Sequence, residues 1–349
     1  MRVAFASLFT PGHGSTPARD RTRRLAADLA DRGHDVTWLC ARWWGGDHAT
    51  FEEDGIRYRS VVVDPVPAAF AAKLPTAVRR CGPDVVHAVN SPPTAGIAAI
   101  VGGRIARAPV VVDWWRDHPD DDPRRYGPLA RAADAVTTPS RTTKTRVREH
   151  GADGDAVRVV PGSIDADLVA SAGVDDRFDA VYSRRLDRHA NVETFLLALA
   201  ELRGRDWTAA VIGDGPERDR IEATASDLRI DDRVSFLGDL PLEERVRIFK
   251  GTHVVAATAT WETFATELAW ALACGCVGLV EYQADSSAHE LLEGRERGRL
   301  VTSPAELADA IVAVGDLERR TVDHDFDAYD HAAVLDRQLD CYRVVRGDE

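Results

Sequence analysis

The sequence AATATWETFATELAWALACGCVGLVEYQADSSAHELLEGRERGRLV, residues 256–301, decides the fold. It begins at the end of an apolar run, and Glu262 follows a short polar turn directly. A helical pattern then runs from Ala265 to Cys274. Gly275 is expected to end that helix, because a residue without a Cβ adopts the left-handed conformation at little cost. This order of strand, acid, helix and glycine places a carboxylate where a strand passes into a helix.

The same stretch continues into a second strand and a second polar turn. Residues 276–280 form an apolar run, and Ser286 and Ser287 then open a short helix that carries Glu290. Strand, helix and strand in this order predict a βαβ unit of a parallel sheet. Ligands of such sheets collect at the carboxyl edge of the strands, where helix N-termini favour anionic groups. The sequence therefore predicts a binding site around Glu262.

Apolar runs and helical patterns alternate along the whole chain, which predicts an α/β fold of doubly wound parallel sheets. Two such sheets indicate two Rossmann-like domains that face each other across a cleft. We expect domains over residues 1–166 and 167–325, an acidic linker at 167–178, and a C-terminal segment, 326–349, that returns to the first domain. The strands are expected within 2–8, 36–40, 84–88, 109–112, 132–140, 157–161, 178–183, 209–212 and 234–237, and further helices at 19–33, 142–150, 191–202, 217–228, 243–250 and 329–345.

Composition narrows the class of protein. The chain has 349 residues, of which 44% are hydrophobic, and this suits two globular domains. A net charge of −13 argues against nucleic acid, because binding phosphates requires a basic surface. Lysine occurs only at Lys73, Lys144 and Lys250, while acids and arginine abound. This balance is typical of a salt-loaded cytoplasm and suggests a halophilic archaeon, although a GC-rich genome would also favour arginine.

The cysteines and the apolar runs indicate where the protein works. Five scattered cysteines, an odd number, predict reduced thiols rather than disulfides, and their spacing makes a zinc site improbable. No apolar stretch approaches the ~18 residues of a spanning helix. Because Met1 leads directly into a strand-like run, we expect no signal peptide. We therefore expect a soluble, cytoplasmic protein, with peripheral membrane contact left open.

Loops of the first half are candidates for binding. Only Gly12 and Gly14 of a G-x-G-x-x-G pattern follow the first strand, so a dinucleotide fingerprint is weakly supported and a plain tight turn is the alternative. Trp43–Trp44 and Trp114–Trp115 each follow a strand. An indole face there could stack on a sugar or a lipid, and packing under the loops is the alternative. Ser140 is placed to cap the next helix.

A resemblance to a known family adds to this reading. Glu262, Phe264 and Ala265, followed by a helix and Ala273–Gly275, resemble the signature of family 4 glycosyltransferases, which is Glu-x-Phe-small, a helix and small-Cys-Gly. The order of further matches along the chain is more specific than any one of them. These matches are Asp84–Ala88, Val157–Pro161, Gly213–Pro216 and Val234–Gly238.

One position departs from that signature. The family usually has a second Glu eight residues after the first, and this chain has Trp270 there. Glu267 lies one turn earlier, about 4.5 Å back along the helix and roughly 60° round it. We expect Glu267 to offer a displaced carboxylate to the same ligand, and Trp270 to stack on the base or the sugar.

The resemblance implies a GT-B fold and transfer from a nucleotide sugar with retention of configuration, without a metal or a protein nucleophile. Arg185, in a segment similar to the family's Gly-Arg-Leu, would grip the diphosphate. Glu262 would accept hydrogen bonds from hydroxyls of the donor sugar. The family's glycine and lysine are Arg184 and Ala190 here, so paired arginines would supply the missing cation. His118 is the candidate beside the reacting sugar.

The resemblance also assigns residues to the two substrates. The donor-binding set is Arg184, Gly215, Gly238, Glu267, Trp270 and Glu290, and the acceptor-side set is Gly12, Gly14, Trp114 and Ser140. The acceptor is expected to be a glycan or a lipid-linked molecule.

Two other functions stay open beside a retaining glycosyltransferase. One is an enzyme of the same two-domain fold with different chemistry, such as a sugar-nucleotide epimerase or a phosphorylase. The other is a non-catalytic relative that binds a sugar or a nucleotide, because two groups of the family's site are missing.

Overall fold

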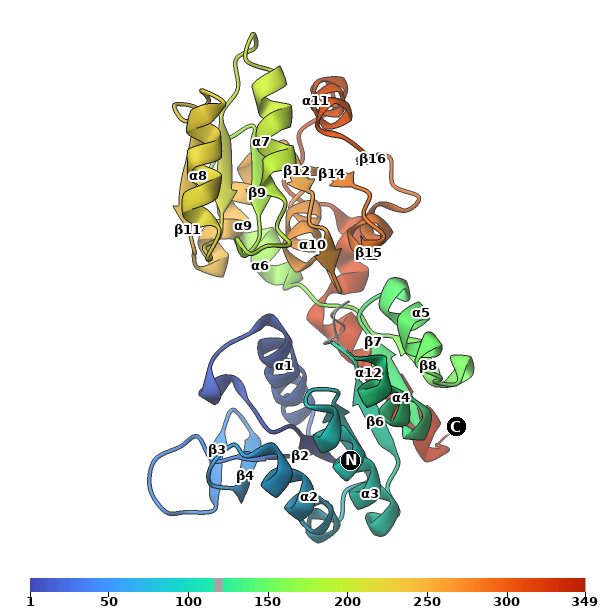
Figure 1. The fold of residues 1–349 in the computed structure, drawn as a ribbon. Helices are drawn as coiled ribbons and strands as arrows, with labels where there is room; N and C mark the ends of the chain where they lie inside the picture. Colours follow the sequence, from blue (N-terminus) through green and yellow to red (C-terminus); the bar gives the residue numbers. More distant parts are fainter. Residues whose placement is uncertain (116–121, 349) are drawn as a thin grey trace. The chain divides into compact units, whose positions relative to one another are not determined.

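The computed structural model describes residues 1–115 and 122–348 and divides into two compact units (Figure 1). The first unit contains Met1–Gly162 and the C-terminal segment from Ala332, and the second contains Ser163–His331. These divisions lie a few residues from the expected ones. Each unit is an α/β structure around a mainly parallel sheet, so the predicted fold class is confirmed.

The first unit is built on an eight-stranded sheet with the order β3-β4-β2-β1-β5-β6-β7-β8. β3 pairs antiparallel with β4, and the other neighbours pair in parallel. The inner strands are rich in Val and Ala and are buried on both faces, as parallel strands usually are. The strands are β1 (Arg2–Ala6), β2 (Asp35–Ala41), β3 (Thr50–Glu53), β4 (Ile56–Val62), β5 (Val85–Val89), β6 (Val110–Asp113), β7 (Ala135–Thr138) and β8 (Val157–Val159).

Helices cover both faces of this sheet. Phe70 and Leu74 of α2 pack with Val86 of β5 on one face, and Leu25 of α1 packs with Val85 of β5 on the other. The helices α1 to α4 each begin with proline, whose fixed φ suits the first helical position. The helices of this part are α1 (Pro17–Asp31), α2 (Pro67–Cys81), α3 (Pro93–Ala106), α4 (Pro123–Ala132) and α5 (Arg141–Glu149).

The C-terminal helix α12 (His331–Arg346) completes the first unit. Leu335 and Leu339 are buried on the same face as α1. The hydroxyl of Tyr342 lies 2.8 Å from Nδ1 of His87 in β5. The last segment of the chain therefore contributes to the core of the unit that the first segment begins.

The second unit is built on a six-stranded parallel sheet with the order β11-β10-β9-β12-β14-β16. A separate two-stranded ribbon joins β13 (Trp261–Glu262) to β15 (Asp285–Ser286). The strands of the main sheet are β9 (Ala180–Ser183), β10 (Ala209–Ile212), β11 (Val234–Gly238), β12 (Val254–Ala257), β14 (Val277–Glu281) and β16 (Gly298–Val301).

The βαβ unit predicted from residues 256–301 is present as β12, α10 and β14. Gly275 ends α10 with a φ of +86°, as expected for glycine after a helix. The helices of this unit are α6 (Ala166–Ser171), α7 (Val192–Glu201), α8 (Arg218–Asp227), α9 (Leu242–Gly251), α10 (Thr266–Ala273) and α11 (Pro304–Ala313). No helix in the described part of the chain is long and apolar enough to cross a membrane.

The expected linker at residues 167–178 is wrong, because this segment belongs to the second unit. It forms most of α6, in which Val169 is 2% exposed. Lys250, at the end of α9, donates from Nζ to the carbonyls of Val169 and Ala172, both at 2.7 Å. The ammonium therefore caps the C-terminus of α6, where unpaired carbonyls favour a cation.

Replacing this lysine should destabilise the protein. Lys250→Met removes a buried charged donor and leaves carbonyls of α6 unpaired, so the free energy of unfolding should fall by about 2–4 kcal/mol. Lys73→Met, at an exposed position on α2, is the matched control and should change it by less than about 0.5 kcal/mol. Urea unfolding measures both. Equal stability of the two variants would contradict the assigned cap.

Candidate functional site

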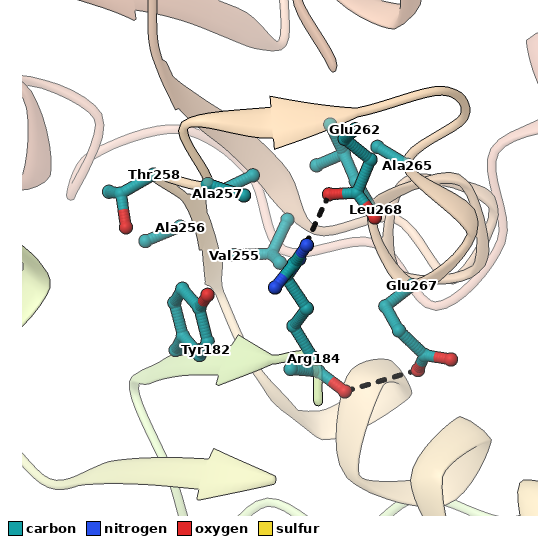
Figure 2. Close-up of a pocket in the computed structure, with 12 residues that line it drawn as sticks. Tyr182, Arg184, Val255, Ala256, Ala257, Thr258, Glu262, Ala265, Glu267 and Leu268 are labelled. Atoms are coloured by element: carbon teal, nitrogen blue, oxygen red, sulfur yellow. Dashed lines mark hydrogen bonds and ion pairs between the residues drawn. The ribbon is translucent and has the colours of Figure 1, made fainter. Parts of the chain in front are cut away.

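A pocket lies at the carboxyl edge of the second unit's sheet, where β9 and β12 end and α10 begins (Figure 2). Parallel α/β sheets bind their ligands at this edge. The pocket has a volume of about 20 Å³, enough for one water-sized group. The lining residues are Tyr182, Ser183, Arg184, Val255, Ala256, Ala257, Thr258, Ala259, Glu262, Ala265, Glu267 and Leu268.

Arg184, directly after β9, points into this pocket toward Glu262 (Figure 2). Three neighbours hold its guanidinium. Its Nε lies 3.4 Å from Oε2 of Glu262. Its Nη1 donates to Oδ1 of Asp187 at 2.7 Å, and its Nη2 donates to the carbonyl of Trp261 at 3.1 Å. Only 12% of the side chain is exposed. A guanidinium is thus fixed at the edge where anionic ligands are expected.

Glu262, in β13, carries an unusual carboxyl group. Its side chain is 21% exposed. Burial raises the pKa of Glu262 to about 7, although the nearby Arg184 acts in the opposite direction. The carboxyl therefore changes charge near neutral pH. A strongly perturbed carboxyl in a pocket beside a specific charge partner is a candidate for function.

Glu267, in the first turn of α10, lines the same pocket as Glu262. Ser183 donates from Oγ to Oε2 of Glu267 at 3.1 Å, and Arg245 of α9 forms an ion pair with Oε1. The structure thus brings the two expected carboxylates together. The role of Glu267 as a ligand of the donor stays a prediction.

Two glycines shape the loop that carries Arg184. A Cβ on Gly213, whose φ is +123°, would lie 2.0 Å from the carbonyl oxygen of Arg184. A Cβ on Gly215 would lie 2.2 Å from the carbonyl oxygen of Leu186. Gly213 also donates its N–H to the carbonyl of Gly238 at 2.8 Å. Gly215, expected to bind the donor, thus packs directly against the loop that follows Arg184. Gly238, also expected to bind the donor, contacts that region through Gly213.

Arg185, the arginine that the resemblance implies for the diphosphate, follows Arg184 directly after β9, and its role stays a prediction. Its side chain is exposed, and its carbonyl accepts a hydrogen bond from Nη1 of Arg184 at 3.3 Å. The structure therefore brings Arg184, rather than Arg185, to Glu262. Ala190, at the position of the family's lysine, is 1% exposed, and its carbonyl accepts from the hydroxyl of Tyr182 at 2.6 Å.

Two other expected donor-binding residues lie elsewhere. Trp270 is 3% exposed and belongs to a run of α10 that is buried throughout. Its indole is covered by the core, so the expected stacking on a base or sugar is wrong for this structure. Glu290 is half-buried in a short 3-10 helix, Ala288–Leu292, and is not among the residues that line the pocket.

The expected glycine loop of the first unit packs against an aromatic side chain. A Cβ on Gly12 would lie 2.2 Å from Cδ2 of Trp43. Gly14 ends a 3-10 turn, Pro11–His13, with a φ of +123°. Gly12 is therefore required by its contact with Trp43, and Gly14 by its backbone conformation, whatever ligand approaches the loop.

The other acceptor-side residues are mostly structural. Trp114 is fully buried, with ring centroids of Tyr126 and His150 at 5.5 and 5.8 Å, so the expected stacking face is wrong. Ser140 accepts at Oγ from the N–H of Thr143 at 3.2 Å, which confirms the predicted helix cap. His118 lies outside the described residues.

Some residues of this edge were not predicted. Asp187 and Arg245 anchor Arg184 and Glu267. The sequence could have indicated Asp187, because an acid three residues after an arginine can pair with it. It could not have indicated Arg245, because α9 reaches the site only through the folding of the chain. In the first unit Arg21 donates to the buried Asp113 at 2.6 Å. An arginine inside an amphipathic helix gives no sign of this pairing.

Two family models match the chain in succession. The glycosyl transferase 4-like domain matches residues 18–162, and glycosyl transferases group 1 matches residues 165–324. The first match covers most of the first unit, and the second covers most of the second unit, including the pocket around Arg184 and Glu262.

Curated relatives match over part of the chain. A 2-deoxystreptamine glucosyltransferase of Streptomyces kanamyceticus is 30% identical over 149 residues, which are 38% of this chain and 38% of that enzyme. A GDP-mannose-dependent alpha-(1-6)-phosphatidylinositol monomannoside mannosyltransferase of Mycolicibacterium smegmatis is 31% identical over 129 residues, 33% of this chain and 34% of that enzyme. The matches therefore span little more than a third of these relatives.

A solved structure matches nearly the whole chain. HepE of Anabaena, in complex with UDP, has a TM-score of 0.75 and 19% identity, covering 97% of this chain and 99% of HepE. At this identity the likeness shows a shared fold.

Proposed function

The chain belongs to the GT-B glycosyltransferases, and from this premise we propose that it transfers a hexose from a nucleotide sugar to a hydroxyl group of an acceptor, with retention of anomeric configuration. The donor is assigned to the pocket of the second unit, and the acceptor, a glycan or a lipid-linked molecule, to the first unit. The reaction would use no metal and would serve a glycoconjugate pathway in the cytoplasm.

The observation that carries this proposal is the pairing of Arg184 with Glu262 at the carboxyl edge of the sheet. Negative charge grows on the diphosphate as it leaves the sugar, and a fixed cation stabilises that charge more in the transition state than in the ground state. Arg184 is such a cation, already oriented by Asp187 and the carbonyl of Trp261. The N-terminus of α10 adds a partial positive charge.

Glu262 has the chemistry to hold the donor sugar. A carboxylate accepts hydrogen bonds from several hydroxyls at once, and this orients the anomeric carbon toward the acceptor. If Glu262 gives up its contact with Arg184 when the donor binds, the lone pairs of its carboxylate oxygens can accept hydrogen bonds from the sugar hydroxyls. HepE, which shares this fold, is in complex with UDP, and this supports a nucleotide as a ligand of the chain.

Binding of nucleotides separates the proposal from a protein without a nucleotide site. UDP, GDP, UDP-glucose and GDP-mannose are each added to the protein in molar salt, which suits its net charge of −13. The proposal expects the melting temperature to rise with at least one nucleotide sugar, because a ligand that binds only the folded state stabilises it. The absence of any shift would favour a relative that binds no nucleotide.

Product analysis then separates transfer from other chemistry. The nucleotide sugar that binds is supplied with a labelled sugar and with 2-deoxystreptamine, phosphatidylinositol or simple methyl glycosides as acceptors. Label in a new glycoside of retained configuration supports the proposal. Label in an epimerised nucleotide sugar, or in a sugar phosphate, would support an epimerase or a phosphorylase instead.

A further inference from the structure

Three helices of the first unit carry basic residues and no acidic ones. The sequences of α2, α3 and α4 contain no aspartate or glutamate, whereas α2 and α3 contain Lys73, Arg79, Arg80 and Arg104. In the helices of the second unit, α6 to α11, acidic residues outnumber basic ones. The chain as a whole has a net charge of −13, so a basic group of helices calls for an explanation.

These helices form one layer over the sheet. All three contribute buried side chains to the core on the face of the sheet that α2 covers. Glycines let the helices approach one another, and α2 and α3 lie side by side (Figure 1). A Cβ on Gly102 of α3 would lie 2.8 Å from Cβ of Val78 in α2. A Cβ on Gly96 of α3 would lie 2.7 Å from Cδ1 of Leu129 in α4. The sides of the helices that point away from the sheet therefore form one continuous surface.

The bases of α2 and α3 lie on the exposed sides of their helices. Lys73, Arg79, Arg80 and Arg104 are all exposed, and none of them forms an ion pair within the part of the chain that the structure describes. In α8 of the second unit, by contrast, both arginines pair with glutamates. The positive charge of α2 and α3 is therefore available to a partner outside this chain.

Helix stability explains only part of this charge. A cation near the end of a helix interacts favourably with the last carbonyls, and this applies to Arg79, Arg80 and Arg104. Arg124 and Arg125 lie in the first turn of α4, where a cation is unfavourable. Both are exposed. An anionic partner outside the chain accounts for the bases at both kinds of position.

Apolar side chains among the bases indicate which anionic partner fits. Val101 and Ile105 of α3 are 42% and 50% exposed, and their spacing places them on the same side of the helix as Arg104. Nucleic acid would contact the bases but not these apolar side chains. An anionic bilayer contacts both, because its phosphates lie above hydrocarbon and a guanidinium pairs with a phosphate through two N–H groups.

We propose that this basic face, which consists of the exposed bases of α2, α3 and α4 together with Val101 and Ile105, docks the protein on a membrane surface that contains anionic lipids. The bases lie against lipid phosphates, and the two apolar side chains reach the boundary between headgroups and acyl chains. Docking is separate from the glycosyl transfer proposed above, because it requires neither donor nor acceptor.

Sedimentation with vesicles tests the role of the charge. The full chain is mixed at about 0.2 M salt with vesicles of phosphatidylcholine, alone or with phosphatidylglycerol. Binding should be at least about tenfold stronger to the vesicles with phosphatidylglycerol. The double variant Arg79→Gln with Arg80→Gln should bind them about 25-fold more weakly, roughly fivefold for each arginine. The control is Arg203→Gln with Arg205→Gln, at exposed positions after α7, and it should bind as the wild type does.

Several results of this experiment would overturn the proposal. They are equal binding to the two kinds of vesicle, no binding to either, and equal losses in the two double variants. Sedimentation equilibrium without vesicles tests a second copy of the chain as the partner. A dimer that dissociates when Arg79 and Arg80 are replaced, in a protein that does not bind vesicles, would assign the face to that second copy instead.

Ile105→Gln tests the apolar part of the face at any salt concentration at which the protein melts cooperatively. It should weaken vesicle binding severalfold and leave the melting temperature unchanged, because the side chain is half exposed. Leu197→Gln, at a position of α7 that is 42% exposed, is the control and should bind as the wild type does. Unchanged binding of Ile105→Gln would contradict the proposed contact with the acyl chains.

The two proposals of function and docking can fail separately. A wild type that binds anionic vesicles but shows no melting shift with any nucleotide would refute the proposed function and support the docking. A nucleotide shift without vesicle binding would support the function and refute the docking.

Discussion

Arg184→Met is expected to lower kcat/KM for the nucleotide sugar roughly 100-fold, the effect typical of removing one preorganised charge-stabilising group from a transition state. Arg184 is the cation that the structure fixes at the pocket, through Asp187, Glu262 and the carbonyl of Trp261. Steady-state kinetics with the donor that binds measures the loss. Nucleotide affinity should fall in parallel, because the diphosphate loses its main partner.

Arg185→Met is the comparison that gives this result its meaning. Arg185 is adjacent in sequence but exposed, so its loss should cost less than about tenfold. Arg203→Met, at an exposed position after α7, should have no effect. If Arg185→Met caused the larger loss, the arginine implied by family resemblance would be the functional one, and the contacts of Arg184 would be structural.

Glu262→Gln should change both turnover and the dependence of stability on pH. Turnover should fall about tenfold or more, because a neutral amide accepts weaker hydrogen bonds from the donor sugar than a carboxylate does. If Glu262 acts as a carboxylate, kcat/KM of the wild type should rise as pH passes through about 7. The variant should lose that rise.

The sign of the stability effect follows from the raised pKa. The carboxyl has a pKa of about 7 in the folded protein and about 4.5 when unfolded. The stability it contributes is therefore fully present below about pH 4.5 and is lost as pH rises through 7. The free energy of unfolding is measured for both proteins at pH 5 and pH 8. The difference between Glu262→Gln and the wild type should shift in favour of the variant by on the order of 2 kcal/mol from pH 5 to pH 8. A constant difference would contradict the raised pKa.

Much of the fold could be predicted because its signals are local. The βαβ unit of β12, α10 and β14 follows from apolar runs on either side of a helical pattern that ends in glycine. Ser140 was predicted as a cap for a similar reason, since capping involves residues within one turn. Periodicity and turn chemistry need no knowledge of distant residues.

The predictions that were wrong, or that the sequence could not make, depend on contacts between residues far apart in the chain. Residues 167–178 look like a linker because they are small and acidic, yet Val169 is buried and Lys250, far along the chain, caps α6. The indole of Trp114 is equally suited to binding and to packing, and only the neighbours that the fold brings to it decide. Arg184 and Arg185 are chemically identical and adjacent, so sequence alone could not tell which one meets Glu262.

Hydrogen exchange with and without saturating nucleotide tests the central claim most directly, which is that the nucleotide sugar binds around Arg184 and Glu262. A nucleotide sugar bound there should stabilise the segments that line the pocket, so exchange should slow in residues 183–190 and 258–268. Arg184→Met should remove that protection. If the nucleotide binds but slows hydrogen exchange only in the first unit, or leaves exchange in these two segments unchanged, the assignment of the donor site to Arg184 and Glu262 is contradicted.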